Sequence, residues 1–209
     1  MPLLSKLQFG SALVYSVRGE SEVSQRSKKV CHAIKRGQEA TLRRAVEHIL
    51  ERFDDTSLHN MLGSDVILVP TPRSALRVPG GLWVPERIAE LLVEEGLGRD
   101  VIPCLERHNK VSKAARQSSG ERPTAEQHFE TIGVSAQLTL AERVTLIDDV
   151  VTQGATLLGA ASRLATDTGY APCAFALIRT MSSGDVDAIV SPCVGEITLD
   201  TSGRTWRRP

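Results

Sequence analysis

Short runs dominated by apolar residues alternate with amphipathic stretches along most of this sequence. Runs of this length are typical of buried strands in a parallel sheet, where both faces of the sheet are covered. Strands are predicted on this basis at 11–17, 66–69, 101–105, 144–147 and 174–178. Ile197 and Leu199 alternate with polar neighbours instead, which indicates an edge strand.

Helical periodicity fills the stretches between these strands. Ser21 is a suitable N-cap for a first helix, Gly37 ends that helix, and a second helix begins near Gln38. The second helix places a set of apolar residues on one face, and these are Leu42, Val46, Ile49, Leu50 and Phe53. Two further helices are predicted, one ending near Gly96 and one around 157–165.

Strands and helices that alternate with short connections predict an α/β fold, with a parallel-sheet core flanked by helices and a small variable extension. A length of 209 residues favours one domain over 1–209. Within it we distinguish an N-terminal strand and helices at 1–60 from a core at 61–209. The basic tail at 204–208 carries a tryptophan that could stack on a planar ligand, but the tail is expected to be frayed.

Composition narrows the function classes. An apolar fraction of 41% with 24% charged residues is ordinary for a soluble globular chain. The formal net charge of zero argues against a dedicated nucleic-acid or membrane-surface binder, so neither partner is expected. The four cysteines are scattered without a CxxC pair, which disfavours a disulfide framework or a zinc site. No stretch has the length and apolarity of a signal peptide or membrane span, and a cytoplasmic location is expected.

The stretch 143–161 carries the clearest chemistry. Its apolar run is followed by Asp148 and Asp149, where the strand is expected to end, and then by a turn of small and hydroxylic residues that leads into a helix. The turn consists of Thr152, Gln153, Gly154, Ala155 and Thr156. This order suits an anion held at a helix N-terminus, with two acids close by that can grip hydroxyl groups. A sugar phosphate offers both kinds of group.

Two other segments are candidates for the same site, because ligands bind at the carboxyl ends of the strands in α/β sheets. The strand at 66–69 runs into a proline-stiffened turn with Arg73, which is either a pyrophosphate clamp or an ordinary strand-to-helix connection. The segment 107–123 is polar and has an excess of basic residues, so it is either a mobile cover over an anionic ligand or a solvated loop.

The residues 144–156 resemble the phosphoribosyl pyrophosphate (PRPP) signature of type I phosphoribosyltransferases: an apolar run, two acids, an apolar pair and a T-x-G-x-T loop. A wider likeness, over about 66–180, is to the ComF-like (competence protein F-like) branch of that family. It rests on weaker matches at 69–73, 80–83, 121–122, Phe129 and the loop that begins at Arg107.

The resemblance implies a role for each matching position. Asp148 and Asp149 would accept hydrogen bonds from the ribose hydroxyls, and the turn 152–156 would bind the 5′-phosphate. The pyrophosphate loop would consist of Thr71, Pro72 and Arg73. Lys113, in the basic cover, would meet the leaving pyrophosphate, so Lys113 and Arg73 are the catalytic candidates. Mg²⁺ is the implied cofactor, held mainly by substrate oxygens and reached by the two acids at most through water.

Two departures leave the acceptor open. Hypoxanthine–guanine phosphoribosyltransferases carry an aspartate where this chain has Thr152, which disfavours a 6-oxopurine acceptor. The ComF-like lineage has a cysteine-rich N-terminal element, whereas Cys31 is the only cysteine in the first 100 residues here.

Three functions are weighed on this basis. The leading hypothesis is a Mg²⁺-dependent phosphoribosyltransferase that joins phosphoribose to an unidentified acceptor, with a nucleobase as one candidate, and releases pyrophosphate. The alternative is a non-catalytic, regulatory PRPP- or nucleotide-binding protein of the same fold, linked to DNA uptake or processing. A hydrolase with Asp148 as nucleophile is the weakest, because no partner acid or lysine is evident. Both a monomer and a homodimer are compatible with the sequence.

Overall fold

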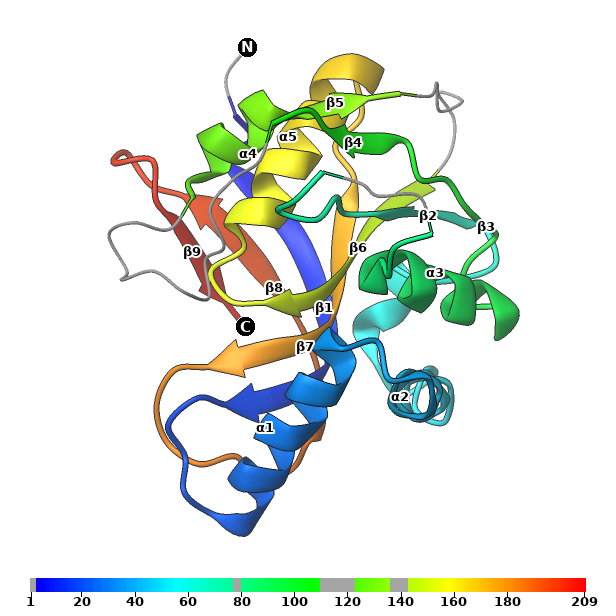
Figure 1. Cartoon of the computed structure of the whole chain (residues 1–209), viewed down its shortest axis with the longest axis vertical. Helices are drawn as coiled ribbons and strands as arrows, with labels where there is room; N and C mark the ends of the chain where they lie inside the picture. The colour runs from blue at the N-terminus through cyan, green and yellow to red at the C-terminus, as the bar shows by residue number, and fades with distance from the viewer. Residues whose placement is uncertain (1–2, 77–79, 110–122, 136–142) are drawn as a thin grey trace.

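A seven-stranded sheet forms the centre of the structure, a computed structural model that describes residues 3–76, 80–109, 123–135 and 143–209. The strand order is β3-β2-β6-β7-β1-β8-β9 (Figure 1). The strands are β1 (Lys6–Ser16), β2 (Val66–Pro70), β3 (Asp100–Val101), β6 (Arg143–Val151), β7 (Cys173–Met181), β8 (Val190–Leu199) and β9 (Thr205–Arg208). The first five in spatial order pair in parallel, and β8 and β9 pair antiparallel. A mostly parallel sheet confirms the α/β class predicted from the sequence.

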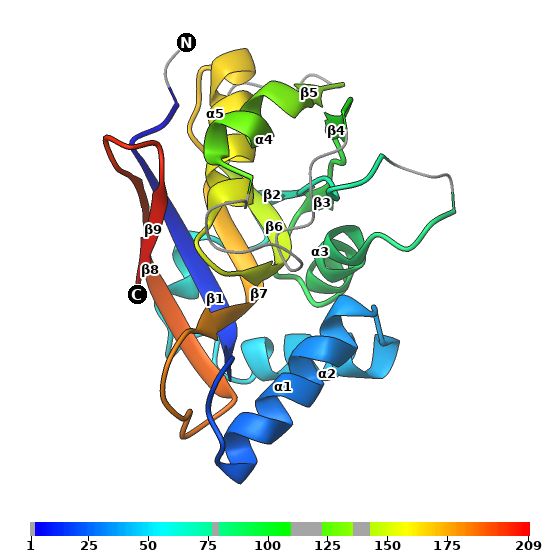
Figure 2. The same cartoon turned by 60° about the vertical axis from the view of Figure 1, so that its left-hand side comes forward.

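Helices cover both faces of this sheet (Figures 1 and 2). They are α1 (Glu22–Lys35), α2 (Glu39–Leu50), α3 (Val84–Glu94), α4 (Ala125–Thr131) and α5 (Ala155–Thr168), with a 3₁₀ turn η1 (Ser57–Asn60) and a small antiparallel pair, β4 (Leu105–Arg107) and β5 (Ile132–Val134). One core lies between the sheet and α1, α2 and α3, and the other between the sheet and α4 and α5. Ile147 faces the first core and Leu146 the second, which explains why the run is apolar at successive positions.

Several local predictions are confirmed, but the placement of Leu50 is wrong. Strands occur at 66–69, 144–147 and 174–178, and the Ser21 side chain caps α1 by accepting from the Ser24 amide at 3.1 Å. Leu50 was expected to face the core but is 46% exposed. It is the last residue of α2, and its neighbour Ile49 occupies the inward position.

The sheet edges differ most from expectation. The strand predicted at 11–17 begins earlier, at Lys6, and the one predicted at 101–105 is divided between β3 and β4. The tail is not frayed, because it forms β9 and pairs with β8. Consequently β8, predicted to be an edge strand, lies inside the sheet. No helix in the described parts of the chain is both long and apolar enough to cross a membrane.

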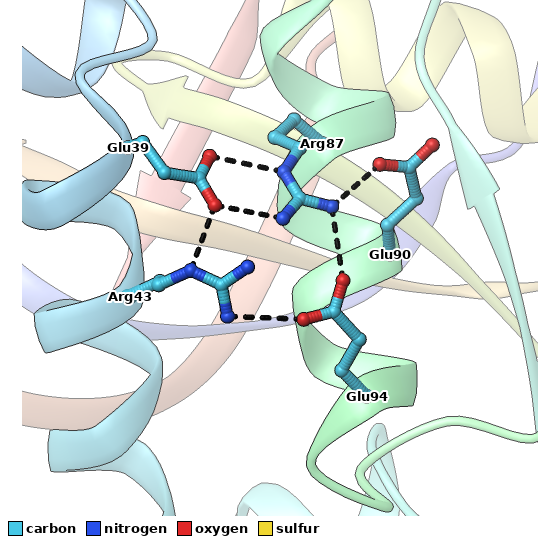
Figure 3. A network of polar contacts seen from close by, with 5 residues as sticks. All are labelled: Glu39, Arg43, Arg87, Glu90 and Glu94. Carbon is cyan, nitrogen blue, oxygen red and sulfur yellow. Dashed lines mark hydrogen bonds and ion pairs between the residues drawn. The ribbon is translucent and has the colours of Figure 1, made fainter.

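An ion-pair network joins α2 to α3 on the surface (Figure 3). Arg87 of α3 contacts Glu39 of α2 at 2.7 Å and also Glu90 and Glu94 of its own helix. Arg43 of α2 bridges Glu39 and Glu94. Isolated surface pairs contribute little, but a shared network of this kind fixes one helix against another. It therefore holds α3, whose first residues line a cavity at the carboxyl ends of the strands.

Candidate functional site

A cavity of about 560 Å³ lies at the carboxyl ends of β1, β2, β6 and β7. It brings together the two predicted segments that the structure describes, and the predicted residues that line it are Thr71, Pro72, Arg73, Asp148, Asp149, Thr152, Gln153, Gly154, Ala155 and Thr156. Lys113 and most of the segment 107–123 lie outside the described residues. The predicted convergence of two loops at one edge of the sheet is thus present.

The acid pair lies inside β6 rather than after it, because the strand continues to Val151. Thr71, at the end of β2, donates its hydroxyl to Asp148 Oδ1 at 3.0 Å, and the Asp149 amide donates to the same oxygen at 3.0 Å. Burial raises the pKa of Asp148 well above its ordinary value, and the neighbouring charge of Asp149 raises it further. A ligand that donates hydrogen bonds to this carboxylate would lower that pKa again.

The N-terminus of α5 has a geometry that suits an anion. Gly154 is the N-cap with φ 87°, and no side chain caps the helix there, so the first-turn N–H groups are directed toward the cavity. A Cβ at Gly154 would lie 2.5 Å from Ile197 Cδ1 of β8. Both the left-handed backbone and this close contact therefore require glycine.

Behind this helix end, a chain of hydrogen bonds runs from Arg107 through His128 to Thr156. Arg107 Nη2 lies 3.0 Å from His128 Nδ1, and His128 Nε2 lies 3.3 Å from Thr156 Oγ1. Because a guanidinium only donates, Nδ1 must accept and the proton must be on Nε2, which donates to Thr156 Oγ1. The Thr156 hydroxyl hydrogen then remains available to donate to an anion in the cavity.

The position of Arg107 differs from the one predicted. It was assigned to the start of a basic cover, yet it lies in β4 and is only 7% exposed. Its Nε donates to the Arg73 carbonyl at 2.6 Å and Nη1 donates to Thr131 Oγ1, so each of its three nitrogens has a partner within the protein. Burial lowers the pKa of Arg107 to about 10. The residue ties the 71–74 loop to the hydrogen-bond chain that reaches Thr156.

The pKa of His128 gives a testable pH dependence. Burial, with the charge of Arg107 second, lowers this pKa from 6.5 to about 4. Between these values the unfolded chain binds a proton that the folded chain does not, so stability is complete above about pH 6.5 and falls by up to about 1.4 kcal/mol per pH unit toward pH 4. Chemical denaturation across pH 4–7.5 should show a shallower fall for His128→Gln than for wild type.

The control for that titration is His59→Gln, because His59 is an exposed histidine outside the cavity. It should leave the pH slope of the free energy of unfolding unchanged. Equal slopes for His128→Gln and wild type would contradict the assignment of a buried, neutral His128.

Sequence reasoning missed several residues around the cavity. Tyr15, Lys35, His128 and Thr180 also line it. Arg207 of β9 supports it from behind, because Nε donates to the Thr152 carbonyl at 2.9 Å and Nη2 donates to the Thr180 carbonyl. The basic residues of the tail were evident in the sequence. Because the tail was expected to be frayed, no contact between Arg207 and the cavity was predicted.

No protein-family model and no curated protein matches this chain. Among the described residues, no group of three or more histidine, cysteine, aspartate or glutamate side chains is placed to hold a metal ion. The cavity does contain the hard carboxylate oxygens of Asp148 and Asp149, which suit Mg²⁺ when a substrate supplies further oxygen ligands.

Proposed function

We propose that this chain is a Mg²⁺-dependent phosphoribosyltransferase of the type I fold, which binds PRPP and transfers phosphoribose to an acceptor with release of pyrophosphate. The observation that carries the proposal is the convergence, in one cavity, of an uncapped helix N-terminus, an adjacent acid pair and the 71–74 loop. The sheet order places β2 directly beside β6, so these three elements are neighbours. Along the PRPP molecule, the 5′-phosphate, the ribose hydroxyls and the pyrophosphate follow one another in the same order as these three elements.

Each group of PRPP has a counterpart in this arrangement. The 5′-phosphate would receive hydrogen bonds from the first N–H groups of α5 and from Thr156. The 2′- and 3′-hydroxyls would donate to Asp148 and Asp149, which lie in β6 before the turn. The pyrophosphate would lie against the loop at Thr71 and Arg73. Bound Mg²⁺ would neutralise charge on the pyrophosphate oxygens.

The reaction requires stabilised charge and little covalent participation from the protein. As the bond from C1 of the ribose to pyrophosphate breaks, the electron pair leaves with pyrophosphate and C1 becomes oxocarbenium-like. The acid pair fixes the ribose, and Arg73 offers positive charge on the leaving-group side. Lys113 remains the second candidate for that role. Exclusion of water favours attack by the acceptor over hydrolysis.

The test is pyrophosphate release from PRPP and Mg²⁺ across a panel of acceptors, together with calorimetric binding of PRPP. We expect acceptor-dependent release, which Arg73→Met reduces at least about tenfold by removing one charge-assisted hydrogen bond. Binding without release for every acceptor would replace the transferase with the non-catalytic, PRPP-binding alternative. Lack of Mg²⁺-dependent binding would contradict both functions.

A further inference from the structure

Part of the cavity wall, which we call the second arm, is not used by the proposed PRPP contacts. It reaches the ends of β1 and β7 and the last turn of α1, where Tyr15, Val17, Lys35 and Thr180 line it. In the sheet, β2 and β7 flank β6 on opposite sides. A ribose held over β6, with its pyrophosphate over β2, would therefore present the opposite side of C1 to this arm. That is the side from which an acceptor must approach when the leaving group departs in line.

Two large aliphatic side chains in the cavity wall are exposed to solvent. Val17 and Leu82 are 49% and 50% exposed, and both line the cavity. Leu82 packs against Gly37, just after α1, and its carbonyl accepts from Arg73 Nη1 at 2.7 Å, so it lies between this arm and the 71–74 loop. Large aliphatic side chains exposed at a cavity are suited to cover the faces of a planar ring.

One cation lies in this arm. Lys35 is exposed in the last turn of α1, and we find no hydrogen bond or ion pair for it among the described residues. Lys35 lines the same cavity as the acid pair expected to hold the ribose. A neutral ring would leave this ammonium without a partner, whereas an anionic ring would pair with it.

We propose that this arm binds the acceptor, and that the acceptor is a planar aromatic or heteroaromatic acid whose carboxylate pairs with Lys35. The inference rests on the proposed phosphoribosyl transfer. A ring nitrogen would give its lone pair to C1 as the bond from C1 to oxygen breaks, and the electron pair of that bond leaves with pyrophosphate. Any proton on the nitrogen passes to solvent water at the open mouth.

The test compares ligands that differ in the carboxylate. Orotate against uracil, and nicotinate against nicotinamide, are titrated calorimetrically into protein saturated with Mg²⁺ and ribose 5-phosphate, which fills the sugar site but cannot react. We expect each acid to bind at least about fivefold more tightly than its neutral partner. Lys35→Gln should abolish this preference and leave the affinity for ribose 5-phosphate unchanged. Lys29→Gln, an exposed lysine of the same helix outside this cavity, should preserve the preference.

Failure of the proposed function and failure of the acceptor assignment give different results. Absence of ribose 5-phosphate and PRPP binding would contradict the proposed function. Equal affinity of the acids and their neutral partners, no binding of any ring, or a preference that survives Lys35→Gln would overturn the acceptor assignment even if PRPP binds.

Discussion

Replacing both acids of the cavity, Asp148→Asn with Asp149→Asn, is expected to weaken PRPP binding by at least about 100-fold, since each charge-assisted hydrogen bond contributes about 1.5–3 kcal/mol. An asparagine keeps one acceptor oxygen but loses the charge. The melting temperature should stay the same or rise, because burial and mutual repulsion already raise the pKa of Asp148. Calorimetry with PRPP and Mg²⁺, beside thermal unfolding, measures both effects.

The chain offers a matched control for this double substitution. Asp54 and Asp55 are also adjacent acids, but they are exposed and lie outside the cavity. Their double replacement by asparagine should leave PRPP affinity unchanged. Unaltered PRPP affinity in the Asp148/Asp149 variant, with wild-type folding, would contradict the proposal that this acid pair binds the ribose.

A second large effect is expected for Gly154→Ala. The left-handed backbone at φ 87° disfavours any side chain, and the new Cβ would lie 2.5 Å from Ile197 Cδ1. Together these should lower the free energy of unfolding by about 2–4 kcal/mol. Affinity for ribose 5-phosphate should also fall at least about tenfold, because Ile197 and the helix end must separate. Denaturant titration and calorimetry give the two numbers.

A glycine at the opposite end of α5 allows the effect of backbone conformation to be separated from the effect of the contact with Ile197. Gly169 has φ 80°, but a Cβ there would meet nothing within 4 Å. Gly169→Ala should therefore show only the conformational part, about 1–2 kcal/mol, with unchanged ligand affinity. Adding Ile197→Val, which removes the nearest atom, should recover part of the Gly154→Ala loss. Equal losses for the two alanine variants and no recovery would show that the contact with Ile197 is unimportant.

The parts of the fold that could be predicted from the sequence are those determined by the local pattern of hydrophobic residues. Strands buried on both faces must be apolar at successive positions, so β2, β6 and the middle of β7 could be read directly. Thr71 and the turn after β6 could then be placed together, because parallel strands bring their carboxyl ends to one edge of the sheet.

The remainder depends on contacts between residues far apart in the chain. Arg107 looks like a solvent-facing arginine until β4 and α4 bring Thr131 and His128 to it. Arg207 is 55 residues from Thr152, whose carbonyl it contacts. Lys35 lies on α1, and the hydrophobic periodicity of that helix indicates only which face packs against the sheet. No local spacing encodes such pairs, and only the assembled sheet reveals them.

The central claim is that one cavity holds PRPP, and calorimetric titration of the wild-type protein with PRPP tests it most directly. We predict saturable binding of one PRPP per chain that requires Mg²⁺, with ribose 5-phosphate binding more weakly because it lacks the pyrophosphate. Absence of saturable binding at millimolar PRPP, or equal binding with Mg²⁺ removed by a chelator, would contradict the account.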